Sequence, residues 1–202
     1  MYLSSYSIPQ GSDAEKQCRR NRENLHRMVL SLFPGLRHQH EGSILYRYIP
    51  EKERLYVQSA AQPSGSSLSL QEIGRMELTE KEPGEFLSFS LLAEPMESLT
   101  VQGGRSHRQP IREPDQKLFW LERQAEASGF AIESIRLARK ETIPFAHYAK
   151  QEGSGNCILH PVEFRGRLKV TDAEAFRKAC LHGIGRGKAY GLGLLLLAPA
   201  NP

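Results

Sequence analysis

The sequence predicts an α+β protein made of two ferredoxin-like domains, each an antiparallel sheet with helices on one face. Three observations lead to this prediction. The chain has 202 residues, which suits one large domain or two compact ones of about 100 residues. Segments in which apolar and polar residues alternate, as in strands, are interspersed with segments of helical periodicity. The order of these segments in the second half repeats the logic of the first.

The first half begins with a strand and a long helix. Residues 2–8 alternate as a strand, and Pro9 and Gly11 end it. The helix is expected to begin at Ser12 or Asp13 and to run without interruption to a Phe-Pro-Gly stop at residues 33–35. Residues 43–50 and 54–59 are expected to be paired strands joined by a charged turn, and residues 86–95 alternate as a further strand.

The second half is expected to follow a basic linker. Residues 103–112 read GGRSHRQPIR, a composition typical of a loop, so we expect domains at residues 1–100 and 114–202 with a linker at 101–113. The elements expected in the second domain are a helix at 114–129, a strand at 130–138, one or two strands within 156–170, a helix at 172–182 and a final strand at 192–197.

Composition excludes several classes of protein. Hydrophobic residues make up 39% of the chain and charged residues 25%, which is typical of a globular protein and not of a disordered or fibrous one. The three cysteines include no Cys-x-x-Cys pair, which argues against a zinc ribbon or a disulfide framework and favours the reducing cytoplasm. No apolar run approaches the roughly 18 residues of a membrane span, and the first ten residues lack the pattern of a secretory leader. His38 and His40 have no second pair at ligand spacing, so we expect no metal site.

A glycine-rich stretch near the end of the chain reads GIGRGKAYGLGLLLLAP over residues 183–199. Its spacing does not fit a Walker A loop, and it follows a helix where a dinucleotide-binding loop would follow a strand. One interpretation is that the glycines let backbone N–H groups approach a phosphodiester closely while Arg186 and Lys188 supply charge. The other is a tight turn that holds the last strand, and the glycines alone do not decide between them.

Cations cluster in two further places, although the net charge is only +4. In the strand EFRGRLKV, residues 163–170, alternation places Phe164, Leu168 and Val170 on one face with Gly166, and Arg165, Arg167 and Lys169 on the other. Three cations on one face favour an anionic partner such as nucleic acid, and the alternative is a solvated strand face.

The first helix carries the other cluster. The segment CRRNRENLHR places Arg19, Arg22 and Arg27 around His26, at the border between a basic surface and the apolar stripe. His26 is therefore either a partly buried packing residue or a general acid/base whose pKa is lowered by the arginines and raised by Glu23. The pattern alone leaves both interpretations open.

Several stretches together resemble the CasE family of CRISPR repeat endoribonucleases, the RNA-processing subunit of type I-E systems. They are ENLHRMVLSLFPG after the first strand, FLSFSLLAEP followed by the basic GRSHRQPI, FWLERQAEASGF, and the final forty residues from FRGRLKV to LLLLAP. The resemblance runs nearly end to end, and its most specific part is the last of these stretches.

The resemblance implies an RRM-like tandem fold and cleavage of CRISPR precursor RNA at the base of the repeat hairpin, without a metal or other cofactor, giving a 2′,3′-cyclic phosphate and a 5′-hydroxyl. It implies that the product stays bound, that the partners are the repeat hairpin and neighbouring Cascade subunits such as the backbone subunit, and that no membrane or direct DNA contact is required. His26 occupies the position of the family's catalytic histidine, and Glu23 stands where the family commonly has a tyrosine.

We expect the Glu23 carboxylate to orient or charge the imidazole of His26. The residues expected to contact RNA are Arg19, Arg22, Arg27, Arg105, Arg108, Arg165, Arg167, Lys169, Gly183, Gly185, Arg186, Gly187 and Lys188. Two rival interpretations are an RNA-hairpin-binding module that does not cleave, and a ferredoxin-like protein-interaction domain.

Overall fold

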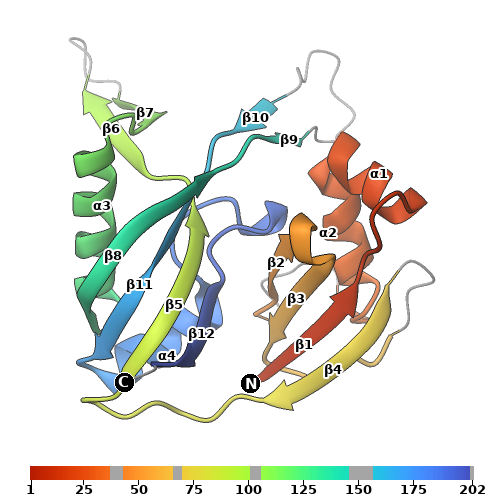
Figure 1. Cartoon of the computed structure of the whole chain (residues 1–202), viewed down its shortest axis with the longest axis horizontal. Helices are drawn as coiled ribbons and strands as arrows, with labels where there is room; N and C mark the ends of the chain where they lie inside the picture. The colour runs from red at the N-terminus through yellow and green to blue at the C-terminus, as the bar shows by residue number, and fades with distance from the viewer. Residues whose placement is uncertain (37–42, 66–69, 101–105, 146–156, 201–202) are drawn as a thin grey trace.

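A computed structural model describes residues 1–36, 43–65, 70–100, 106–145 and 157–200 (Figure 1). The first part of the chain forms β1 (Tyr2–Ser7), α1 (Asp13–Arg20), α2 (Arg22–Leu30), β2 (Leu45–Ile49), the short 3-10 turn η2 (Pro50–Lys52), β3 (Arg54–Ser59) and β4 (Gln71–Glu77). The rest forms β5 (Phe86–Ala93), β6 (Met96–Thr100), β7 (Ser106–Pro110), α3 (Pro114–Ala127), β8 (Phe130–Lys140), β9 (Ile143–Phe145), β10 (Cys157–Leu159), β11 (Val162–Val170), α4 (Ala173–His182), η3 (Lys188–Tyr190) and β12 (Leu195–Pro199).

Two four-stranded antiparallel sheets confirm the predicted fold class. The N-terminal sheet has the order β2-β3-β1-β4 and the C-terminal sheet the order β12-β5-β11-β8. In Figure 1 the two sheets lie side by side, with α3 on the outer left of the molecule and α1 and α2 at the upper right. Where the chain is described, no helix combines the length and the apolar character needed to cross a membrane.

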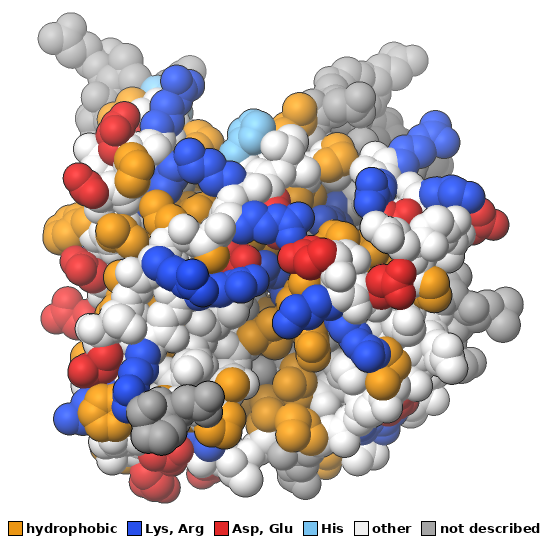
Figure 2. Space-filling view, viewed as in Figure 1, with side chains coloured by type: hydrophobic (Ala, Val, Ile, Leu, Met, Phe, Trp, Pro, Cys, Tyr) orange, Lys and Arg blue, Asp and Glu red, His pale blue; other side chains and the backbone are white. Residues whose placement is uncertain are grey.

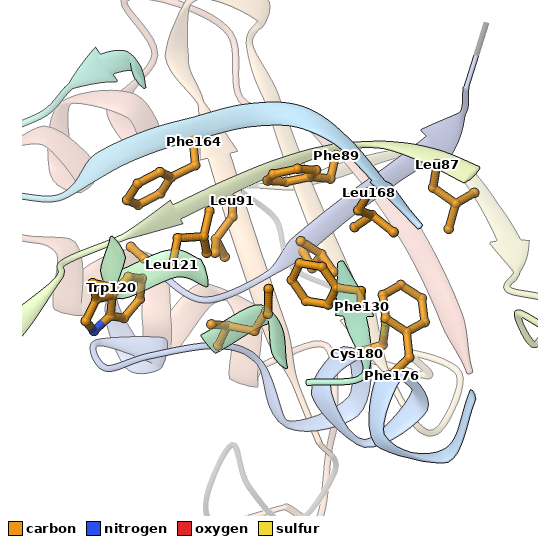
Figure 3. Packing of buried hydrophobic residues seen from close by; sticks show 14 of the residues in the cluster. Leu87, Phe89, Leu91, Trp120, Leu121, Phe130, Phe164, Leu168, Phe176 and Cys180 are labelled. Carbon is orange, nitrogen blue, oxygen red and sulfur yellow. The ribbon is translucent and has the colours of Figure 1, made fainter. Parts of the chain in front are cut away.

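The C-terminal core is built between the sheet and the helices α3 and α4. Alternate residues of β5 and β11, among them Phe89 and Phe164, point from the sheet toward the helices (Figure 3). Phe130 meets Phe176 of α4 edge-on at 5.9 Å between ring centroids, and Trp120 of α3 stacks on Phe164 at 6.1 Å. Aromatic pairs in these geometries add about 0.5–1.5 kcal/mol each beyond their apolar burial.

The sheets divide earlier in the chain than the predicted domain boundary at residue 100. β5 pairs with β11 and β12, so it is a central strand of the second sheet and not the last strand of the first. With β5 included, the second domain runs βαββαβ with the strand order of a ferredoxin-like sheet. The first domain keeps the same order with one helical layer, α1 and α2, because β4 follows β3 with no helix among the described residues between them.

The predicted linker is also different in the structure. Met96–Thr100 and Ser106–Pro110 pair as an antiparallel hairpin, β6–β7, between β5 and α3. Residues 101–105, including Arg105, lie outside the described part of the chain. Residues 106–110 of the basic segment therefore belong to a strand of a hairpin, where a loop was expected.

The predicted long helix is broken at Asn21. The backbone of Asn21 is extended (φ −154°, ψ 118°), and its side-chain oxygen accepts a hydrogen bond from the Glu23 N–H at 3.0 Å. Asparagine is a favoured N-cap because its side chain satisfies an N–H group that a helix leaves unpaired. The Asn24 side chain donates to the Gln17 carbonyl at 3.0 Å and ties the two helices together.

The remaining predicted elements are found with shifted ends. Pro114 opens α3, and the Asp172 side chain caps α4 by accepting from the Ala175 N–H at 3.0 Å. β4 and β9 were not predicted. The final strand begins at Leu195 because the preceding Gly193 has φ +84° and belongs to the glycine-rich loop.

Candidate active site

His26 lies where α2 of the first domain meets the glycine-rich loop of the second. It is half-buried, and its ring lies over Tyr46 of β2 with 6.4 Å between centroids and 29° between planes. The Tyr46 hydroxyl donates a hydrogen bond to the Ala189 carbonyl of η3, and α2 packs against η3 and β9. The candidate catalytic histidine is therefore held at the junction of the two domains.

The surroundings of His26 favour a neutral imidazole. Its Nδ1 is buried and has no hydrogen-bond partner among the described residues. Burial lowers the pKa of His26 below its ordinary value, the Glu23 carboxylate works in the opposite direction, and the Arg27 guanidinium adds to the lowering. At neutral pH the ring can therefore accept a proton, which is what a general base requires.

Tyr46 connects the two halves of this site. Its side chain is fully buried, and burial raises its pKa well above the ordinary value of a tyrosine. The phenol therefore keeps its proton and remains the donor to the Ala189 carbonyl. The sequence does not reveal this residue, because only the fold brings it to the glycine-rich loop.

The glycines of the loop have internal roles. Gly183, Gly185 and Gly187 have φ between +73° and +83°, a backbone conformation that favours glycine. A Cβ atom on Gly183 would lie 2.9 Å from the Leu45 side chain, and one on Gly191 would lie 3.1 Å from the Tyr46 ring. The contacts of Gly183 and Gly191 bring the loop against β2 and explain these two glycines by packing. A close approach of RNA to the loop backbone stays a prediction.

The two cations of the loop differ. The Lys188 ammonium is partly buried and donates to the Gly185 carbonyl at 2.8 Å, and burial lowers its pKa. Arg186 is exposed. Of the two, Arg186 is the one presented to solvent for an anionic ligand.

The cationic face of β11 has the predicted alternation, with Phe164, Leu168 and Val170 in the core. Arg165, however, forms an ion pair with Glu163, whose carboxylate lies 3.0 Å from its Nε. Arg167 and Lys169 lie over the Phe86 ring, at 5.1 Å and 5.4 Å from its centroid. Phe86 is 40% exposed, and it is a further residue of this face that the pattern of charges did not reveal.

The arginines of the first two helices also have different surroundings. Arg19 forms an ion pair with Glu15, and Arg22 lies over the Tyr48 ring at 5.7 Å with a buried Nε that has no hydrogen-bond partner in the described structure. Arg27 is exposed on α2, and Arg108 is exposed on β7.

The predicted cations do not form one cluster. The β6–β7 hairpin stands at the opposite side of the molecule from α1 and α2 (Figure 1). On the face shown in Figure 2, Lys and Arg side chains extend in a broken band across the middle, with carboxylates among them.

A buried ion network lies between the two sheets beside this site. Arg47 of β2 is only 3% exposed, and its guanidinium lies 3.2 Å from Glu163 and 3.8 Å from Glu141 of the second domain. Arg139 pairs with Glu51 of the first domain at 2.6 Å. Within the described residues no three His, Cys, Asp or Glu side chains gather to hold a metal ion, and His38 and His40 lie outside them.

The chain is similar to known proteins over nearly its whole length. A family model described as CRISPR associated protein matches residues 1–199. CRISPR-associated endoribonuclease Cse3 of Thermus thermophilus is 33% identical over 124 residues, a stretch that covers 58% of this chain and only 57% of that protein.

Solved structures of related proteins share the fold over nearly the whole chain. CRISPR endoribonuclease Cse3 bound to a 19-nucleotide RNA superposes with a TM-score of 0.85 at 25% identity, over 98% of this chain and 100% of the other. Cas6e from Escherichia coli K-12 superposes with a TM-score of 0.74 at 25% identity, over 99% and 100% of the two chains.

Proposed function

This chain belongs to the family of CRISPR associated proteins, within it to the CasE family, and we propose that it is an endoribonuclease that cleaves CRISPR precursor RNA at the base of the repeat hairpin. The observation that carries the proposal is the position of His26. It is a half-buried imidazole with a lowered pKa, held at a domain junction with the exposed Arg27 next to it, in a fold shared with an RNA-bound endoribonuclease.

The proposed reaction uses the RNA's own 2′-hydroxyl and needs no metal ion. The 2′-oxygen attacks the neighbouring phosphorus, a bond from O2′ to phosphorus forms, and the bond to O5′ breaks. The neutral His26 takes the proton of the 2′-hydroxyl, and the imidazolium returns a proton to the departing O5′. The products are a 2′,3′-cyclic phosphate and a 5′-hydroxyl, and cations near the phosphate stabilise the charge that develops on its oxygens.

The remaining cations are proposed to hold the hairpin. An A-form stem hides the base edges of its major groove, so contacts to its backbone position the RNA more than they specify its sequence. The residues proposed to make such contacts are Arg105, Arg108, Arg167, Lys169 and Arg186. Arg165 is proposed to contribute less, because Glu163 neutralises it.

We further propose that the cleaved hairpin stays bound and that the protein acts in the cytoplasm as a subunit of Cascade, as the CasE resemblance implies. A product that stays bound limits the enzyme to about one turnover per molecule. The amount of product should then equal the amount of enzyme when RNA is in excess.

The test is cleavage of a CRISPR repeat hairpin RNA in EDTA by the native protein and by His26→Ala, with a second RNA that carries a single 2′-deoxyribose at the cut. We expect cleavage by the native protein only, and none of the deoxy RNA. Mass spectrometry of the product should find the cyclic phosphate. Tight binding without cleavage by the native protein would favour the hairpin-binding module instead, and cleavage that requires added metal would contradict the mechanism.

A further inference from the structure

A cavity of about 350 Å³ opens between the first two helices and the end of the second sheet. Arg19 and Arg22 line it from the first domain, and Arg139, Lys140 and Glu141 line it from the second. β9, which follows these residues, reaches from the second sheet to α1 and α2 (Figure 1). The fold thus brings four cations from two distant stretches of sequence around one space.

Two of these cations are compensated by carboxylates and two are not. Arg19 pairs with Glu15, and Arg139 pairs with Glu51 at 2.6 Å. Lys140 is exposed and Arg22 is half-buried, and neither has an ion-pair partner among the described residues. The cavity therefore presents uncompensated positive charge, which favours an anion.

Arg22 connects this cavity with the proposed reaction site. It precedes His26 by four residues on α2, so the two side chains lie on the same face of the helix, about 6 Å apart along its axis. Each has a buried nitrogen without a hydrogen-bond partner in the described structure, Nε of Arg22 and Nδ1 of His26. A strand with one phosphate at His26 can therefore place a neighbouring phosphate at Arg22.

The size of the cavity decides which part of an RNA it takes. Sites of about 300 Å³ and above enclose a single small organic ligand. A cavity of about 350 Å³ accommodates one nucleotide and is too small for a duplex stem. The occupant is therefore unpaired.

We propose that this cavity binds the single-stranded nucleotide that adjoins the cleavage site, with Arg22 and Lys140 contacting its phosphate. The inference rests on the proposed function, since it takes His26 as the position of the scissile phosphate. The charge pattern of the sequence does not predict that Lys140 takes part in an RNA site, because residues 139–140 lie 117 positions or more from Arg22 and only the fold brings them together.

The test measures binding with RNA that cannot be cut. Dissociation constants in EDTA are compared for two repeat RNAs. One ends at the hairpin base, and the other has unpaired nucleotides on both sides of the hairpin and a single 2′-deoxyribose at the cut. The variants are Lys140→Ala and Arg22→Gln, with Lys16→Ala as a control that removes one exposed charge of α1 outside the cavity. Circular dichroism of Arg22→Gln verifies its fold, since Arg22 also packs on Tyr48.

We expect Lys140→Ala and Arg22→Gln to weaken binding of the flanked RNA about three- to tenfold and to leave binding of the bare hairpin unchanged. The slope of log affinity against log salt should become about 0.7 less steep with the flanked RNA only, as for one phosphate contact to a single strand. Lys16→Ala should change both RNAs equally or neither.

Equal effects of Lys140→Ala on both RNAs, or none on either, would overturn the inference. Because this RNA is uncleavable, the outcome does not depend on catalysis. If the native protein cleaves normally but binds the flanked RNA and the bare hairpin with equal affinity, only the role of the cavity is overturned. If the native protein binds neither RNA, the proposed function is overturned as well.

Discussion

Replacing Arg47 by methionine tests whether the buried ion network holds the two domains together. The change keeps an unbranched side chain of similar length and removes the charge. Glu163 and Glu141 are then left with side chains only 2% and 7% exposed and without the cation that lies 3.2 Å and 3.8 Å from them. A buried carboxylate that has lost its cationic partner is the expected source of instability.

The expected cost is worked from the contacts that remain. Removing one partner of a buried ion pair typically costs about 3–5 kcal/mol. Glu163 keeps Arg165 at 3.0 Å and the Ser90 hydroxyl at 2.7 Å, which lowers the cost. Nε and Nη1 of Arg47 are buried without hydrogen bonds among the described residues, so their removal also relieves about 1–3 kcal/mol of desolvation. We therefore expect Arg47→Met to lower the free energy of unfolding by about 2–3 kcal/mol.

The assay is urea unfolding at pH 7, followed by circular dichroism, with Arg75→Met as the control. Arg75 pairs with Glu72 on the surface of β4 at 2.7 Å, and loss of such a pair should cost less than about 1 kcal/mol. Glu163→Gln in the Arg47→Met background should recover part of the loss. A change below 1 kcal/mol for Arg47→Met would refute the reasoning.

The effect should also depend on pH. Burial alone would raise the pKa of Glu163, but hydrogen bonds from Arg165 and Ser90 and the charge of Arg47 hold it below its ordinary value. The stability that this ionised carboxylate contributes is present above its unfolded pKa and is lost as pH falls through the folded pKa. The difference between native protein and Arg47→Met should therefore narrow below about pH 4.

Four further predictions concern the site. The single-turnover cleavage rate should rise with pH through an apparent pKa below the ordinary histidine value of about 6.5, because His26 must be neutral to act as a base. A rate–pH profile should move to lower pH in Glu23→Gln and to higher pH in Arg27→Gln, and the reverse order would contradict the proposed electrostatics. Gly191→Ala should lose about 2 kcal/mol of stability in urea, because the residue has φ +83° and the added methyl meets the Tyr46 ring; a neutral result would mean that the loop relaxes freely. Tyr46→Phe should slow cleavage with little change in RNA affinity, because the hydrogen bond to the glycine-rich loop is lost; equal binding and equal rate would show that this bond does not position the site.

Alternation and helical spacing predict most strands and helices, but they do not predict which strands pair in a sheet. Alternation along residues 86–93 identifies a strand, and the same residues, from Leu87 to Ala93, do enter a core. Alternation does not say which sheet the strand joins, because the pairing with β11 and β12 is decided by residues far along the chain. The domain boundary was therefore placed after β5 instead of before it.

The helix break illustrates a signal that was present but outweighed. Asn21 is followed two residues later by Glu23, which is typical of a helix start, but the apolar spacing continues across it and favoured one long helix. In the structure the capping hydrogen bond prevails, and α2 begins one turn before His26.

The site could be predicted only in part for a similar reason. The resemblance to the CasE family points to His26, which the charge pattern alone leaves undecided, and its half-buried side chain fits a border between basic and apolar surfaces. Its neighbours Tyr46 and Ala189, and the cavity residues Arg139 and Lys140, come from other segments that only the tertiary fold brings near. The acid that compensates Arg165 is Glu163, which alternation places on the same face of the strand but which the count of cations leaves out.

The central place of β5 has a consequence for how the chain folds as it leaves the ribosome. The N-terminal sheet is complete once β4, Gln71–Glu77, has emerged, so the first domain can close while the rest is still unmade. β5 emerges next, yet its neighbours Val162–Val170 and Leu195–Pro199 are translated about 70 and 100 residues later. During that interval both edges of β5 are unpaired, and the side chains of Leu87, Phe89 and Leu91 are not yet buried. We therefore expect a nascent-chain chaperone to bind this segment, and we expect a chain terminated before β11 to aggregate.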